Sequence, residues 1–312
     1  MNAGNSASPV AGKKKKNRFS SDSRQAVIML APMLVGFALF TYVPIFYILR
    51  YCMFYYNGFK SSFTGLDNFV RVFTRDPKFW MSIVNTFILS GCKLLIEIPL
   101  ALMLAVLLNK ALKGTNFFRV TLFLPAIMST AIIGLIFSLM FAAYQGVINN
   151  ILMQVGLINA PINWFGEKWT AMSVIGIASV WNYFGINMIF FLMALQSVPK
   201  DLYECADIDG ITPMRKFFSI TLPMIGPIFQ VVLLMAIVGS LKVSDLVLVL
   251  TNGQPGGSTE VVMTYVFKSF FGRDNRSVEI GYASAMSIIT GIILAIVSYI
   301  YMRMTRKMNE NT

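Results

Sequence analysis

Long runs without any charged side chain dominate this sequence. Four of them hold 25, 31, 25 and 23 consecutive uncharged residues, at positions 25–49, 169–199, 217–241 and 280–302. A further stretch, residues 120–143, is almost wholly apolar. A helix of about 20 apolar residues crosses the roughly 30 Å of hydrocarbon in a bilayer, and inside lipid it satisfies its own backbone hydrogen bonds. These runs therefore predict membrane-spanning helices.

A sixth apolar stretch contains two charges, Lys93 and Glu97. They are four residues apart, so they share one helix face and can form an intramembrane ion pair. Charges at membrane depth face a bundle interior or a water-filled cavity. The pair either locks neighbouring helices or contacts a substrate directly. The sequence predicts an all-α membrane protein with six transmembrane helices, at residues 26–49, 83–108, 120–143, 171–195, 218–241 and 280–302.

The composition argues against soluble and most catalytic classes. Only 13% of the residues are charged, roughly half the share found in soluble domains. The absence of histidine removes Ser-His-Asp triads and histidine metal sites. The three cysteines, Cys52, Cys92 and Cys205, form no CxxC motif. We therefore expect no catalytic residue, no metal site and no enzymatic activity in this chain.

Lys and Arg are unequally shared between the two sides of the predicted bundle. Six spans place both termini on one side, which holds 15 basic residues against 9 on the other. The positive-inside rule then places both termini in the cytoplasm. We expect residues 1–25 and 307–312 to be tails, the first of them disordered. Its four lysines at 13–16 favour contact with membrane lipid over a nucleic-acid arm.

Residues 200–217, between the fourth and fifth spans, are rich in charged and helix-boundary residues. Asp201 can cap a helix with Glu204 as its capping-box partner, and Gly210 suits the left-handed residue that ends such a helix. The dipeptide Thr212-Pro213 can begin a second helix. Two interpretations remain open. The segment is an interfacial helix that only joins two spans, or it docks into the groove of a cytoplasmic partner.

The same segment resembles a known motif. Glu204-Cys205-Ala206 is followed by Gly210 and then by Ile220-Thr221-Leu222-Pro223, a spacing similar to the EAA loop of ABC importer permeases. Cys205 stands where the family usually has alanine, which is a small-for-small change. The resemblance implies that this loop couples the permease to an ATPase. It assigns this role to Glu204, Ala206, Asp209, Gly210 and Pro223.

Other short segments occur in the order found in the binding-protein-dependent carbohydrate permeases, a family that serves sugars and glycerol phosphate. They are Gly65-Leu66-Asp67-Asn68-Phe69, Asn85-Thr86, Phe117-Phe118-Arg119 with Leu124-Pro125, Gln196-Ser197-Val198-Pro199, Thr251-Asn252-Gly253-Gln254-Pro255 with Thr259, and Gly281-Tyr282-Ala283-Ser284-Ala285. Gln254 departs from the glycine of the family. The resemblance extends over residues 26–306, which we assign to the permease domain.

This resemblance implies an importer in a bacterial or archaeal cytoplasmic membrane. Its parts would be two homologous permeases, two copies of a cytoplasmic ATPase and an extracytoplasmic solute-binding protein. The sequence has no G-x-x-x-x-G-K-[ST] phosphate loop, so ATP and Mg²⁺ would bind to the ATPase and this chain would hold no cofactor. A di- or oligosaccharide would cross by alternating access. The alternative is a self-contained secondary transporter or channel, with Lys93 and Glu97 as ion-coupling groups.

The expected substrate pathway combines aromatic and polar side chains of the fourth and fifth spans. Aromatic rings stack on sugar faces, while amides and hydroxyls bond to sugar hydroxyls. The candidates are Trp181, Asn182, Tyr183, Asn187, Ser240 and Lys242. For the aromatic residues, helix packing or an interfacial position explains the pattern equally well.

Overall fold

The computed structural model describes residues 19–110, 114–272 and 277–309, and the chain divides into two compact units, residues 1–50 and 51–312. The parts of the expected tails before residue 19 and after residue 309 lie outside the described residues. The first unit is one long apolar helix: α1 (Phe19–Phe37), a π-helical turn η1 (Ala38–Tyr42), and the start of α2 (Val43–Tyr51). Residues 19–25, the last part of the tail expected to be disordered, form the first turns of α1.

Two π-helical turns widen long helices, and each lies just before a proline. Tyr42 ends η1 two residues before Pro44, and Thr221 ends η2 (Phe217–Thr221) two residues before Pro223. Proline has no N–H and cannot donate the usual bond to the carbonyl four residues earlier. A wider turn at this point absorbs the gap and lets the helix continue without a break.

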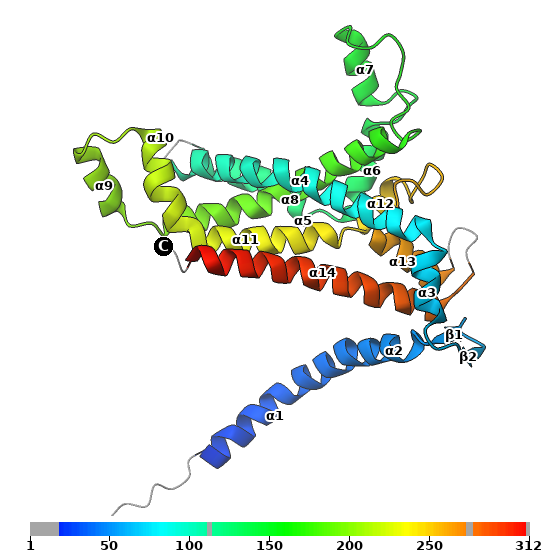
Figure 1. Cartoon of the computed structure of the whole chain (residues 1–312). Helices are drawn as coiled ribbons and strands as arrows, with labels where there is room; N and C mark the ends of the chain where they lie inside the picture. Colours follow the sequence, from blue (N-terminus) through cyan, green and yellow to red (C-terminus); the bar gives the residue numbers. More distant parts are fainter. Residues whose placement is uncertain (1–18, 111–113, 273–276, 310–312) are drawn as a thin grey trace, which may run out of the picture. The chain divides into compact units, whose positions relative to one another are not determined.

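The second unit is built around four long helices that lie side by side (Figure 1). They are α4 (Pro77–Asn109), α8 (Lys168–Gln196), α11 (Leu222–Leu241) and α14 (Ile280–Asn309). Small residues allow close packing: Ala101 of α4 and Ala194 of α8 are fully buried in one apolar cluster. The backbone of α8 also approaches α5 (Thr115–Ile127) closely, since a Cβ atom at Gly185 would lie 2.3 Å from the Leu122 carbonyl oxygen.

The third expected span, residues 120–143, is not one continuous helix. α5 and α6 (Thr130–Met140) meet at an angle of 98°. Met128 is extended, and the Ser129 hydroxyl accepts a 3.3 Å hydrogen bond from the Ala131 N–H, which starts a new helix. Within the described residues, five helices are long and apolar enough to cross a membrane, or six if this bent pair counts as one span.

Shorter elements occupy the two ends of the bundle (Figure 1). One end carries the segment α9 (Lys200–Ile208) and α10 (Pro213–Lys216), together with the C-terminal end of α14. The opposite end carries the remaining elements: the antiparallel strands β1 (Phe54–Tyr56) and β2 (Ser61–Phe63), α3 (Asp67–Thr74), α7 (Val147–Gln154), α12 (Asp245–Leu250) and α13 (Val262–Phe271).

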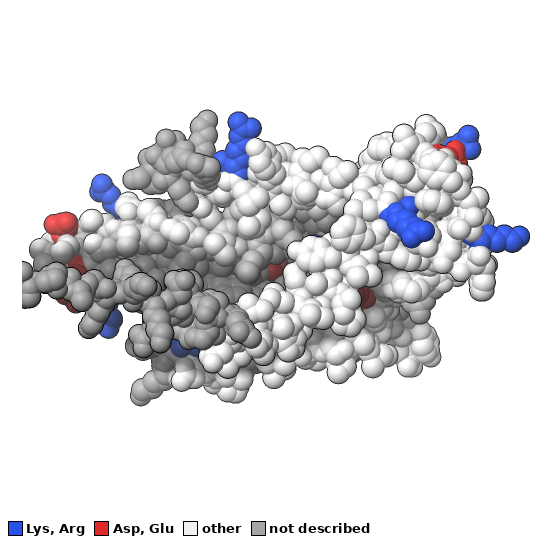
Figure 2. Space-filling view, turned by 90° about the horizontal axis from the view of Figure 1, so that it is seen from below, with Lys and Arg blue, Asp and Glu red and all other residues white. Residues whose placement is uncertain are grey.

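The described surface is largely uncharged. Figure 2 shows a face that is mostly white, with Lys and Arg in scattered places. Large apolar side chains such as Leu95, Leu139 and Met235 are more than half exposed in the second unit. Such a surface is costly in water and favourable in lipid, as expected for spanning helices.

Candidate functional site

The segment from α9 to α10 forms the first candidate site. The helix α9 ends in a Schellman motif, in which Ile211 N–H donates to the Ala206 carbonyl over 3.0 Å and Gly210 N–H donates to the Asp207 carbonyl over 3.1 Å. Gly210 has a φ of +69°, as its left-handed position requires. No atom lies within 4 Å of a Cβ built there, so the backbone conformation, rather than space, selects glycine.

The start of α9 differs from the expected capping box. Pro199 occupies the N-cap position, with no side-chain capping bond, and Asp201 lies inside the first turn. Proline at the cap fixes the chain direction without a side-chain acceptor. The carboxylates of Asp201, Glu204 and Asp209 are therefore left exposed.

Ala206 and Ile208 have opposite environments. Ala206 is 2% exposed and packs inside the subunit, so any role in coupling acts through packing rather than contact with another chain. Ile208 is 87% exposed at the tip of the segment. It lies between the exposed side chains of Asp207 and Asp209.

Two side-chain contacts fasten α9 to the helix that follows. Lys216 and Asp207 form an ion pair, and the hydroxyls of Tyr203 and Thr221 lie 2.9 Å apart. Pro223 lies at the start of α11, directly after the π turn. α10 and η2 thus lead directly into α11, and α9 is joined to them by two side-chain contacts.

A buried polar cluster lies between α4 and α8. Lys93 Nζ is 3.4 Å from Glu97 Oε2, and the two side chains are only 4% and 1% exposed. Asn187 Nδ2 donates to Glu97 Oε1 over 2.5 Å. The Lys93 ammonium also lies 4.1 Å from the ring centre of Tyr183. Lys93 and Glu97 thus lie at ion-pair distance on one face of α4, and two of the expected pathway residues, Asn187 and Tyr183, are their neighbours.

A polar pocket of about 200 Å³ adjoins this cluster. Its charged and polar lining comes from three parts of the fold: Thr130 at the bend before α6, Tyr183 on α8, and Lys242, Ser244 and Asp245 between α11 and α12. Ser244 Oγ donates to Asp245 Oδ1 over 2.9 Å. The pocket therefore offers an aromatic ring, hydroxyls and one charge of each sign.

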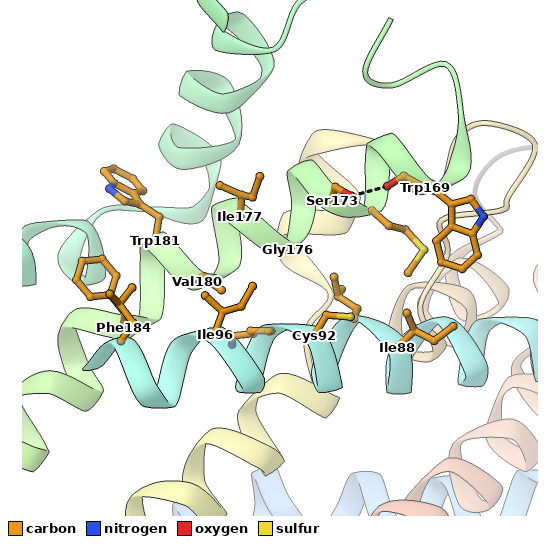
Figure 3. Close-up of a pocket in the computed structure, with 14 residues that line it drawn as sticks. Ile88, Cys92, Ile96, Trp169, Ser173, Gly176, Ile177, Val180, Trp181 and Phe184 are labelled. Atoms are coloured by element: carbon orange, nitrogen blue, oxygen red, sulfur yellow. Dashed lines mark hydrogen bonds between the residues drawn. The ribbon is translucent and has the colours of Figure 1, made fainter. Parts of the chain in front are cut away.

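The other expected pathway residues do not reach this pocket. Asn182 and Ser240 are buried, and the Ser240 hydroxyl is bonded to the Ile237 carbonyl. Trp181 lines a separate apolar cavity of about 440 Å³ between α4 and α8, where Figure 3 shows it on the same side as Ile177 and Phe184. It also packs against Phe137, with 5.7 Å between ring centres.

Sequence reasoning missed Thr130, Ser244 and Asp245. Thr130 was assigned to the middle of a continuous span. In such a position a threonine hydroxyl usually bonds to a carbonyl of its own helix, so it does not indicate a binding site. Ser244 and Asp245 could have been found from the sequence. Asp245 lies three residues after Lys242, at the end of a long apolar run, so two opposite charges stand at one end of a predicted span.

The loop between α12 and α13 is fixed by a second buried ion pair. Lys268 Nζ lies 2.9 Å from Glu260 Oε1 and donates to the Asn252 carbonyl over 2.6 Å. From α4, Asn85 Nδ2 donates to the carbonyls of Ser258 and Glu260 over 2.8 and 2.9 Å. The Asn85-Thr86 motif thus contacts the residues on either side of Thr259, in the loop that begins at Thr251.

Among the described residues, no group of three or more acidic or cysteine side chains is close enough to hold a metal ion. The described residues that stand out are a polar pocket beside a buried ion pair, and an acidic segment at one end.

The chain is similar to permease subunits along most of its length. The family model for the binding-protein-dependent transport system inner membrane component matches residues 97–310. The arabinooligosaccharides transport system permease protein AraP of Bacillus subtilis (strain 168) is 32% identical over 95% of this chain and 94% of its own length. The lactose transport system permease protein LacF of Rhizobium radiobacter is 32% identical over 88% of this chain and 91% of its own.

A solved structure has the same fold. The crystal structure of a bacterial ABC transporter involved in the import of the acidic polysaccharide alginate matches with a TM-score of 0.80 and 26% identity, over 93% of this chain and 99% of the other. A long family match, relatives above 30% identity and a shared fold agree with one another. The chain belongs to the binding-protein-dependent transport system inner membrane components, the multi-pass permease subunits of ABC importers.

Proposed function

We propose that this subunit imports a neutral or weakly charged sugar, with a di- or oligosaccharide as substrate. The observation that carries this proposal is the pocket of Tyr183, Lys242 and Asp245. An aromatic face and balanced hydrogen-bonding groups suit the hydroxyl-covered ring of a sugar. The names of its relatives agree, since they refer to arabinooligosaccharides, lactose, and trehalose or maltose.

The bend between α5 and α6 supports alternating access at this pocket. Thr130 follows the bend and lines the pocket, while Lys242 and Asp245 flank the break between α11 and α12. A break in a spanning helix leaves non-helical backbone beside a cavity. Transporters have such discontinuous helices at their substrate sites. Relative movement of these two broken helices would open the pocket to one side or the other.

The partners follow from the family. A second permease, two copies of an ATPase and a solute-binding protein would complete the transporter, and ATP and Mg²⁺ would bind to the ATPase. The exposed acids of α9 and Ile208 would contact the ATPase. The end of the bundle that carries α9 would face the cytoplasm of a bacterium or archaeon, because the loops assigned to this side hold more Lys and Arg.

Transport into proteoliposomes tests this proposal. The assembled transporter would be supplied with its binding protein and with radiolabelled arabinotriose, lactose or maltose. Uptake of one of them should require ATP and should persist when an ionophore removes ion gradients. Uptake that needs no ATP and stops with the ionophore would instead establish the ion-coupled alternative.

Pocket variants test where the sugar binds. Lys242→Gln and Asp245→Asn should each weaken uptake about five- to tenfold, the value of one lost hydrogen bond to the substrate. Trp181→Phe is the matched control, because Trp181 lines the apolar cavity instead. Basal ATP hydrolysis should be unchanged in all three, and equal loss of uptake in the control would place the substrate elsewhere.

A further inference from the structure

A third cavity lies at the end of the bundle that carries α9. Its volume is about 610 Å³. One wall is the last three turns of α4, with Leu102, Val106 and Leu107. The other is formed by α10, at the end of the 200–217 segment (here called the coupling segment), and by the π turn η2, with Met214, Phe217 and Phe218. All six of these side chains are apolar, and none belongs to the sugar pocket or to the buried ion pairs.

The rim of this groove carries two lysines. Lys110 follows directly after α4, and Lys216 ends α10; both line the groove. Lys216 is paired with Asp207, whereas no carboxylate in the described part of the chain forms an ion pair with Lys110. The groove therefore has a net positive rim above an apolar interior.

The length of the groove matches one leaflet of a bilayer. Its lining along α4 runs from Pro99 to Lys110, the residue just after the helix; these twelve residues are separated by eleven steps of 1.5 Å, or about 16 Å. Half of the roughly 30 Å hydrocarbon core is about 15 Å. With Lys110 at the membrane surface, the apolar wall extends as deep as a single acyl chain.

We propose that this groove binds an anionic phospholipid, with the phosphate between Lys110 and Lys216 and an acyl chain along α4. Basic pockets between helices on the cytoplasmic side are suited to anionic headgroups. A water-soluble partner would leave the deep apolar wall unfilled. A hydrophobic helix of another subunit would fill the wall but give Lys110 no anion. A phospholipid offers both an anion for the lysines at the rim and an acyl chain for the apolar wall.

A lipid in this groove would also affect coupling to the ATPase, because the groove lies beside the contact between α9 and the π turn η2. The groove is also lined by Tyr203 and Thr221, whose hydroxyls link α9 to the π turn. A lipid there would pack between α4 and the coupling segment and support their relative position. We expect ATP hydrolysis that is stimulated by the binding protein to be stronger in anionic lipid than in zwitterionic lipid.

Lipid retention tests the charged rim. The complete transporter would be placed in nanodiscs of equal phosphatidylglycerol and phosphatidylethanolamine, released into detergent, and its retained lipids measured by native mass spectrometry. Retained phosphatidylglycerol should fall about fivefold in Lys110→Gln and about 25-fold in the double variant with Lys216→Gln, following the usual value of one lysine near anionic lipid. Lys200→Gln, an exposed lysine outside the groove, is the control and should retain wild-type levels.

Quenching of tryptophan fluorescence tests the apolar wall. Met103→Trp would place an indole in the groove, and Met235→Trp would place one on exposed α11 as a control. Brominated phosphatidylglycerol should quench the indole at 103 more than brominated phosphatidylethanolamine, and both should quench the indole at 235 equally. Equal quenching at 103 would mean ordinary bulk lipid, and no quenching would mean that protein fills the groove. Either result overturns the proposal, as does unchanged lipid retention in the double variant.

Discussion

The ammonium group of Lys93 lies 4.1 Å from the ring centre of Tyr183. Tyr183 is thus shared between two structures: its ring contacts the buried ion pair, and its side chain lines the polar pocket. A cation over an aromatic face is attracted by the electron-rich ring, and more strongly when water is excluded. The ion pair therefore contacts one wall of the pocket through the Tyr183 ring.

The ion pair should be structural. Glu97→Gln should lower the thermal stability of the assembled transporter strongly, because breaking a buried pair leaves one charge without a partner, at a cost on the order of 3 kcal/mol. Lys93→Met combined with Glu97→Gln should be more stable than Glu97→Gln alone. Melting in detergent, followed by size-exclusion chromatography, measures both.

The same variants distinguish the two interpretations of the pair. In the structural case, uptake per assembled transporter stays close to normal in the double variant. If instead each single variant assembles normally while uptake is abolished, Lys93 and Glu97 act directly in transport. Asn187→Ala would add a third probe, since its amide donates to Glu97.

Gly185 should be intolerant of any side chain. A Cβ atom there would lie 2.3 Å from the Leu122 carbonyl oxygen, a backbone atom that cannot rotate away. Gly185→Ala should destabilise the subunit by about 2 kcal/mol, within the range for overpacked sites. Gly176→Ala, on the same helix, is the control: its Cβ would meet only Leu89 Cδ1 at 3.7 Å. Equal melting temperatures for the two variants would contradict this close helix contact.

The spans could be predicted because every backbone N–H and C=O group in the hydrocarbon of a bilayer has to be hydrogen-bonded within the protein. A run such as 217–241 allows one structure in hydrocarbon, a helix, and the helix is observed with only its proline-linked π turn as a local change. Gly210 was likewise predictable, because a left-handed residue at a helix end is a local requirement. The resemblance to the EAA loop also used Gly210, together with Glu204-Cys205-Ala206 and Ile220-Thr221-Leu222-Pro223.

Other features depend on contacts that sequence alone does not specify. The break at Met128 and Ser129 lies in an uncharged, largely apolar run; Pro125 precedes it by three residues, but a proline alone does not specify a bend of 98°. The pair of Glu260 and Lys268 is buried, although both residues lie in a stretch that reads as an exposed connection. The polar pocket joins residues more than 100 positions apart, and only the packing of α8 against the two broken helices brings them together.

The orientation of the bundle gives a labelling prediction. In a background without the three native cysteines, Asn109→Cys at the end of α4 should react with a membrane-impermeant maleimide only from the cytoplasm. Tyr144→Cys, an exposed position at the opposite end, should react only from outside. Gly114 and Gly256 are poorer sites because both have positive φ. The reverse labelling pattern would invert the orientation inferred from the basic residues.

Gly210 should be the tightest constraint in the coupling segment. A side chain at its φ of +69° costs roughly 1–2 kcal/mol for most residues, whereas asparagine tolerates this region. Because the surrounding space is open, Gly210→Asn should keep most function, while Gly210→Val should loosen the turn and misplace Ile208 and the acids of α9.

Co-purification of the ATPase with the permease measures this prediction, together with uptake of the labelled sugar. Gly210→Val should insert normally, because no spanning helix is touched, yet lose bound ATPase and uptake together. Glu204→Gln removes an exposed acid without changing the backbone and should weaken ATPase binding less. If Gly210→Val retains the ATPase and full uptake, the left-handed turn is not required for coupling, and α9 serves only to connect two spans.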